Sequence, residues 1–144
     1  MRLTMLPAIL QAAENFCIHQ IILPYSRISN NEKKRTLIAY LDIETPDGDK
    51  HRAYLACDKI LIQYIAEIFL GEENSDEETL TDMLLETTNM IIGSAKVISE
   101  ESHDHPFSIS TPHFFKEDYF TMPCDGTHTI QVANGEMMIA IKAL

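Results

Sequence analysis

The sequence lacks the motifs that identify several common classes of protein. Its three cysteines form no C-x-x-C pair, and it contains no G-x-x-x-x-G-K, G-x-G-x-x-G or G-x-S-x-G element. Nucleotide binding and a serine hydrolase site therefore have no support. Cys17, Cys57 and Cys124 are odd in number and far apart, and we interpret them as buried or half-buried thiols. The run His103-Asp104-His105 lacks the i, i+4 spacing of helical zinc ligands, so we interpret it as a solvated loop rather than a metal site.

Basic residues and long apolar runs are also scarce. The 11 Lys and Arg residues are outnumbered by 22 Asp and Glu residues, and the formal net charge is −11. This balance argues against nucleic acid or an anionic membrane surface as a partner. No apolar run approaches the roughly 18 residues that a membrane span needs. The apolar stretch over residues 1–10 is broken by Pro7 and followed at once by Gln11, Glu14 and Asn15, which does not suit a signal peptide. We therefore expect a cytoplasmic protein with no membrane insertion.

The remaining composition is that of an ordinary globular chain. With 144 residues, 45% of them apolar, we expect one domain over residues 1–144 with one core. Apolar spacing and turn residues predict the elements. These are helices over 3–23, 58–70 and 75–99, a loop or an irregular edge over 26–35, and strands over 36–44, 50–57, 107–111, 114–122, 127–133 and 137–143. Since helices and strands are largely segregated, we predict an α+β fold with long helices packed on a largely antiparallel sheet.

Turn and capping residues set the predicted boundaries. Pro46-Asp47-Gly48-Asp49 predicts the turn of a hairpin between the first two strands, because Pro presets φ and Gly accepts a positive φ. Asp58 is the expected N-cap of the second helix, and Gly71 is its expected stop. The run from Ser75 to Glu78 has the S-x-x-E form of a capping box for the third helix. Asn134-Gly135 predicts a hairpin between the last two strands.

The helix predicted over residues 75–99 has two distinct faces at about 100° per residue. One face is expected to pack against the sheet, and the opposite face is polar. The expected buried residues are Leu80, Met83, Leu84, Thr87, Ile91, Ser94, Ala95 and Ile98; the opposite face holds Asp82, Glu86, Asn89, Gly93 and Lys96. Leu85 and Ile92 border the polar face, which hints at a contact surface.

Glu86 and Asn89 are the candidate site residues on the polar face. They are three residues apart, so their Cβ atoms should lie roughly 5–6 Å from each other. Gly93 lies one turn beyond Asn89, and a glycine within a helix costs about 1 kcal/mol relative to alanine. Close approach of a partner is one reason for a glycine there. Taken alone, a Glu and an Asn on an exposed helix face are ordinary, so these residues leave both a solvated surface and a functional site open.

The segment Glu86-Thr87-Thr88-Asn89-Met90-Ile91-Ile92-Gly93 resembles the E-x-x-N-M-x-x-G signature of the CheX and CheC chemotaxis phosphatases. Its surroundings resemble that family too. The helix that ends at Gly71 before Glu72 and Glu73, the hairpin over 36–57, and the strand and proline over 107–112 all have counterparts. The resemblance covers most of residues 36–115 and implies a CheC-like fold.

This resemblance implies a phosphatase that acts on a phosphorylated response regulator of the CheY type. Glu86 would dock by pairing with a lysine of the regulator's active site, and Asn89 would orient the water that attacks the aspartyl phosphate. Positioning the water is a large part of such catalysis, and an amide can both donate to and accept from a water while staying uncharged. The divalent metal is expected on the regulator, so we expect no cofactor or metal bound by this chain itself.

The resemblance also bears on the number of sites. CheC-type members carry the E-x-x-N pattern twice, whereas residues 3–23 offer only Glu14 with Asn15, or Glu14 with Cys17. The chain is therefore CheX-like, with one site, and a possible homodimer is implied. The alternative is a non-catalytic adaptor of the same fold that binds a response regulator or a flagellar-switch component. Retention of both Glu86 and Asn89 favours the enzyme.

Overall fold

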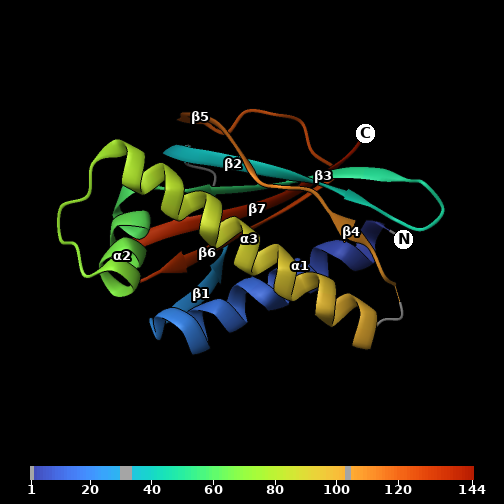
Figure 1. The fold of residues 1–144 in the computed structure, drawn as a ribbon, viewed down its shortest axis with the longest axis horizontal. Coiled ribbons are helices and arrows are strands. Elements are labelled where there is room, and N and C mark those ends of the chain that lie inside the picture. The colour runs from blue at the N-terminus through green and yellow to red at the C-terminus, as the bar shows by residue number, and fades with distance from the viewer. Residues whose placement is uncertain (1, 30–33, 103–104) are drawn as a thin grey trace.

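The computed structural model describes residues 2–29, 34–102 and 105–144, and shows helices packed on one antiparallel sheet (Figure 1). The predicted α+β class is thereby confirmed. The helical elements are α1 (Arg2–Asn15), the π-helical turn η1 (Phe16–Ile21), α2 (Lys59–Leu70) and α3 (Glu77–Ser102). The strands are β1 (Tyr25–Ile28), β2 (Arg35–Glu44), β3 (Lys50–Cys57), β4 (Ser108–Ile109), β5 (His113–Tyr119), β6 (Gly126–Val132) and β7 (Gly135–Ala143).

The sheet has the strand order β1-β6-β7-β3-β2-β4, and β5 also pairs with β2. Every pairing among these strands is antiparallel. β2 is long enough to pair with β5 through its first half and with β4 through its last two residues. The segment that follows α3 is therefore attached to the edge of the sheet, close to the middle of that helix.

The three helices lie on the same side of the sheet, with α3 crossing it and α1 beside α3 (Figure 1). One large cluster of buried residues joins these helices to the inward side chains of the strands, among them Leu41 of β2, Leu55 of β3 and Ile139 of β7. Burial of this apolar surface is the main favourable term in folding. The cluster fixes the position of α3, and therefore the direction in which its outer face points.

The opposite side of the sheet carries a smaller core. Ile38, Tyr54, Ala56 and Ala140 are buried there, and the segment from Phe120 to Cys124 packs against them. The central strands are thus covered on both sides, which explains their nearly continuous apolar runs. No helix in the described part of the chain is long and apolar enough to cross a membrane.

The first 35 residues depart most from the sequence prediction. The helix predicted over 3–23 ends as η1 at Ile21, because Ile22 takes a left-handed backbone conformation with φ 53°. Residues 26–35 were predicted as a loop or an irregular edge, and there β1 (Tyr25–Ile28), which begins one residue earlier, forms a regular edge strand that pairs with β6. That pairing is made with a strand a hundred residues away, and a polar local sequence gives no signal of it. The rest of that loop prediction is partly untested, since residues 30–33 lie outside the described residues.

The helix caps were mostly predicted. Asp58 caps α2 by accepting from the Leu61 backbone N–H at 3.0 Å, and Gly71 ends that helix with φ 72°. The predicted cap at Ser75 was wrong, because Asp76 accepts from the Thr79 backbone N–H at 2.8 Å. A carboxylate is an equally good cap and carries a charge that suits the helix dipole. The same hydrogen bond lowers the pKa of Asp76 below its ordinary value.

The last hairpin turns one residue earlier than predicted. Val132 pairs with Gly135, so the turn is Ala133-Asn134, and Ala133 has a φ of 53°. Gly135 begins β7 beneath the N-terminus of α2. A Cβ added at this glycine would lie 2.7 Å from Leu61 Cβ and 2.8 Å from the Asp58 carboxylate. Glycine is therefore needed here for close approach to α2 and not for the turn.

Candidate functional site

Glu86 and Asn89 lie in the middle of α3, on the face that points away from the sheet. The two residues between them are fully buried, Thr87 at 0% and Thr88 at 1% exposure. Thr88 donates its hydroxyl to the Leu84 carbonyl at 2.8 Å, so it meets its hydrogen-bonding need within the helix. The buried pair locks the rotation of α3, and the predicted positions of Glu86 and Asn89 on the exposed face are confirmed.

Neither candidate side chain is engaged by the residues that the structure describes. Glu86 and Asn89 are both exposed, and in the described ranges neither makes a side-chain hydrogen bond or ion pair. The two groups lie one helical turn apart. The carboxylate of Glu86 offers hydrogen-bond acceptors, and the amide of Asn89 offers both donors and an acceptor. Such a pair can bind a second molecule without first breaking a hydrogen bond or ion pair to another described residue.

A polar hollow lies beside the pair, with a volume of about 500 Å³. One wall is α3 and the other is the segment that leaves β4. The lining residues are Leu85, Glu86, Asn89, Ile109, Ser110, Thr111 and Pro112. The strand and proline over 107–112 are part of the resemblance to the CheX and CheC family. The structure brings that segment and the Glu86–Asn89 pair to the same place.

The wall opposite α3 is attached firmly to the sheet. The Ser110 backbone N–H donates to the Asp42 carbonyl at 2.9 Å, and the Asp42 backbone N–H donates to Ser110 Oγ at 2.8 Å. Asp42 itself is held by Arg52, whose Nε donates to its carboxylate at 2.7 Å. These contacts extend the β2–β4 pairing by one residue. The hollow therefore has two walls of defined position.

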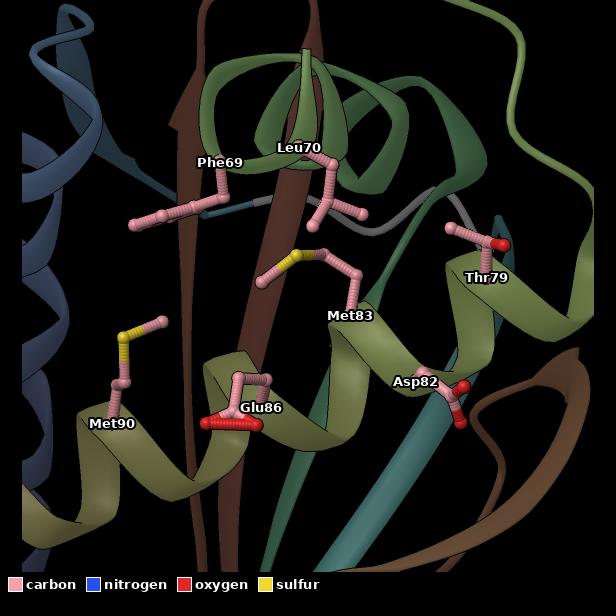
Figure 2. Close-up of a pocket in the computed structure, with 7 residues that line it drawn as sticks. All are labelled: Phe69, Leu70, Thr79, Asp82, Met83, Glu86 and Met90. Carbon is pink, nitrogen blue, oxygen red and sulfur yellow. The ribbon is translucent and has the colours of Figure 1, made fainter. Parts of the chain in front are cut away.

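A second groove, also of about 500 Å³, lies on the other side of Glu86. In Figure 2, Phe69 and Leu70 at the end of α2 point toward Met83 and Met90 of α3, and Glu86 lies on the near side of α3 beneath them. The complete lining is Phe69, Leu70, Thr79, Asp82, Met83, Glu86 and Met90. Sequence reasoning missed this groove. The available signal was the apolar run Ile68-Phe69-Leu70 before Gly71, whose three members are all exposed.

Gly93 lies on the same side of α3 as Asn89. Among the described residues beyond the adjoining backbone of α3, a Cβ at this position would meet no atom within 4 Å. Packing inside the chain therefore gives no reason for a glycine at a position where alanine would favour the helix. The expectation that the glycine allows a partner to approach is compatible with this open space.

For two residues of α3, the face predicted from helical periodicity was wrong. Ile92, expected at the border of the polar face, is 1% exposed and belongs to the main core. Ser94, expected to be buried, is exposed. The prediction considered only the packing of α3 against the sheet. Because α1 and β4 also pack against α3, a different set of its residues is buried.

The first helix offers no second pair of this kind. Glu14 accepts from Arg27 Nε at 2.8 Å and from Arg27 Nη2 at 3.0 Å. Cys17, three residues further along, is completely buried, and burial raises the pKa of its thiol to about 11, with a smaller contribution from Glu14.

Among the described residues, no group of three or more His, Cys, Asp or Glu side chains is placed to hold a metal ion. Of the His103-Asp104-His105 run, the first two residues lie outside the described residues. His105 follows α3 and donates its backbone N–H to the Ser99 carbonyl at 3.0 Å.

Residues 47–134 match the family model described as chemotaxis phosphatase CheX. Among solved structures, the chemotaxis protein CheX from Vibrio vulnificus is 24% identical with a TM-score of 0.78, over 97% of this chain and 99% of that one. A chemotactic CheC-like protein from Shewanella oneidensis is 20% identical with a TM-score of 0.78, over the whole of both chains. A CheX-CheY-BeF3-Mg²⁺ complex from Borrelia burgdorferi matches with 15% identity and a TM-score of 0.62, over 95% of this chain and 97% of that one. At these identities the solved structures show the shared fold. No curated protein gives a significant match.

Proposed function

We propose that this chain, which belongs to the CheX family of chemotaxis phosphatases, hydrolyses the aspartyl phosphate of a CheY-type response regulator. The observation that carries the proposal is the pair Glu86 and Asn89, exposed and unengaged in the described chain, beside a hollow between α3 and the segment after β4. In the Borrelia burgdorferi complex, a CheX of the same fold is bound to a CheY. A receiver domain is therefore the partner we assign to this face.

In this proposal Asn89 enters the active site of the receiver and holds the attacking water in line with the phosphorus atom. The transition state of phosphoryl transfer asks for positioning and charge stabilisation rather than for a covalent helper. The amide oxygen of Asn89 accepts from the water, and the amide nitrogen can donate to it or to a phosphoryl oxygen. A carboxylate in the same place would meet the negative phosphoryl group with a like charge.

Glu86 docks the two proteins by pairing with a basic side chain of the receiver. Its carboxylate has no competing partner in the described chain, so no ion pair has to be broken before docking. The charge of the chain, −11 overall, also favours encounter with a basic surface. The divalent ion that assists the chemistry belongs to the receiver in this scheme, as does the aspartyl phosphate itself.

The rival proposal is an adaptor that binds a response regulator or a flagellar-switch component without hydrolysis. An adaptor needs a docking surface but has no use for an amide placed to orient water. The presence of Asn89 one turn from Glu86 therefore supports the enzyme. The extent of the domain over residues 1–144 and the homodimer stay predictions.

The decisive experiment follows the decay of a phosphorylated CheY-type receiver with and without catalytic amounts of this protein. We expect faster decay with the wild-type chain, and a loss of about 10²-fold or more in kcat for Asn89→Ala, since mispositioning of a reactant alone can cost that much. Binding of the variant to the receiver should be nearly intact, because Asn89 is exposed and makes no side-chain hydrogen bond with the described residues.

Two other results would count against the proposal in different ways. Unchanged decay with measurable binding to the receiver would favour the adaptor. Full activity in Asn89→Ala would refute the mechanism even if the wild-type chain is a phosphatase. Circular dichroism of the variant provides the control for folding.

A further inference from the structure

The apolar groove on the α2 side of Glu86 has no role in the chemistry described above. It lies between the C-terminal end of α2 and the first half of α3, and its floor is Met83, which is 5% exposed (Figure 2). Leu70 and Phe69 stand at its rim with 52% and 38% of their surface exposed. Apolar side chains gathered around a hollow on the surface, next to polar functional groups, are typical of an interaction site.

The groove and the polar hollow meet at Glu86, which lines both. Any molecule whose basic group pairs with Glu86 while another part reaches Asn89 must lie along α3 at this point. Its surface on the other side of the basic group then faces Leu70 and Met83. The groove is therefore continuous with the docking surface of the proposed function.

The charges that line the groove indicate what kind of molecule can occupy it. Asp82 and Glu86 are the charged residues that line the groove, and neither hollow is lined by a Lys or Arg. The occupant should therefore combine an apolar side chain with a neighbouring positive charge. A second copy of this chain, with its net charge of −11, suits an acidic rim poorly.

We propose that this groove is the second half of the receiver-binding surface and takes an apolar side chain of the receiver that lies beside the basic residue paired with Glu86. The groove contributes affinity and selects among receivers, while Asn89 contributes the chemistry. Two methionines in the lining suit this task, since their unbranched side chains adapt to different partners. The inference rests on the proposed function, because it takes the receiver as the molecule that meets Glu86.

The closing experiment compares two substitutions on α2. Leu70→Ser removes an apolar side chain from the rim of the groove. Ile60→Ser is the matched control, because Ile60 is on the same helix, is also 52% exposed, and lines neither hollow. Both sites are surface positions, so both variants should fold. KM and kcat are measured with the phosphorylated receiver, and Kd with the receiver activated by BeF3 and Mg²⁺.

We expect Leu70→Ser to raise KM and Kd by about fivefold, as the loss of roughly half of a buried leucine contact implies. The kcat should be unchanged, and Ile60→Ser should match the wild-type chain in all three constants. In an Asn89→Ala background, Leu70→Ser should weaken Kd by the same factor. That result would place the effect on binding alone.

The outcomes separate this inference from the function on which it rests. If wild-type protein accelerates decay and Leu70→Ser equals Ile60→Ser, the groove is not a receiver site and the phosphatase proposal stands. If decay is not accelerated, the phosphatase proposal fails, and the Kd comparison still decides the groove. No binding of the activated receiver, or an effect of Leu70→Ser only on self-association in sedimentation, would overturn the inference.

Discussion

Two helices on the same side of the sheet, α1 and α3, each carry a glutamate, and the two glutamates differ in the contacts they make. Glu14 of α1 is held by two hydrogen bonds from Arg27 of β1. Glu86 of α3 has no such partner in the described chain. Three residues beyond Glu14 stands a completely buried cysteine, whereas three residues beyond Glu86 stands an exposed asparagine.

Glu14 supports the fold, whereas Glu86 is the residue that the proposed function assigns to contact with a second molecule. The Glu14–Arg27 pair joins α1 to the edge strand β1, so its contacts lie within the chain. Glu86 gives the chain no such contact and is flanked by two hollows. In this protein, residue type alone would not distinguish the two glutamates, but their engagement within the fold does.

The largest effect expected from this comparison is that of reversing the charge of Glu86. Glu86→Lys should raise KM for the phosphorylated receiver by about tenfold or more, equivalent to about 1.4 kcal/mol, because attraction to a basic group becomes repulsion. The kcat should change much less. Steady-state kinetics at low and high salt provide the measurement, and salt should reduce the difference between variant and wild type because the charges are exposed.

Glu86→Gln is the matched control for shape, and its KM should fall between those of the wild type and Glu86→Lys. Thermal unfolding of both variants should match the wild type, since Glu86 makes no hydrogen bond or ion pair with the described residues. An unchanged KM in Glu86→Lys would show that docking does not use this residue.

A smaller effect is expected at Gly93, where an added methyl group should stabilise the helix but hinder the approach of the receiver. Gly93→Ala should stabilise the protein by roughly 0.5–1 kcal/mol, because alanine favours the helix and its Cβ would clash with none of the described residues. The same methyl group should raise KM about threefold if the receiver lies close to α3 there, as a small steric mismatch would. Denaturant unfolding and steady-state kinetics on one preparation measure both effects.

Ser94→Ala is the control for Gly93→Ala, because Ser94 is the neighbouring exposed residue on α3. It should change stability little and KM not at all. If Gly93→Ala stabilises the fold and leaves KM unchanged, the glycine is not explained by the approach of a receiver.

The parts of the fold that the sequence predicted are those decided by local physics. The hairpin from Arg35 to Cys57 follows from β-branched runs around a Pro-Asp-Gly turn, and α2 from an Asp cap and a Gly stop. β1 was missed because its pairing with β6 is decided by a distant strand. The cap of α3 was missed because Ser75 and Asp76 are both good caps; Ser75 instead donates its backbone N–H to Gln63 at 3.0 Å.

Of the two hollows beside Glu86, the sequence pointed to residues that line one and gave no sign of the other. Helical periodicity placed Glu86 and Asn89 together, and the family resemblance gave them their expected roles. The resemblance to the CheX family is confirmed by the match over residues 47–134. The groove could not be predicted from the sequence. It forms because the end of α2 lies across Met83 and Met90, and no local pattern determines how two helices pack.

The smallest effect is expected at Glu14, and it is the converse of the Glu86 test. Glu14→Ala should lower the melting temperature slightly, because Arg27 lies at the surface with 63% of its side chain exposed, and ion pairs with a solvated partner contribute little. The KM and kcat should stay within about twofold of the wild type, as is usual for surface changes away from a site. Arg27→Ala should have the same effect on melting, and the double variant should be no less stable than either single one, since both remove the same interaction. If Glu14→Ala reduced activity as strongly as Glu86→Lys, α1 would carry a second working site, and the distinction drawn from its engaged glutamate would be wrong.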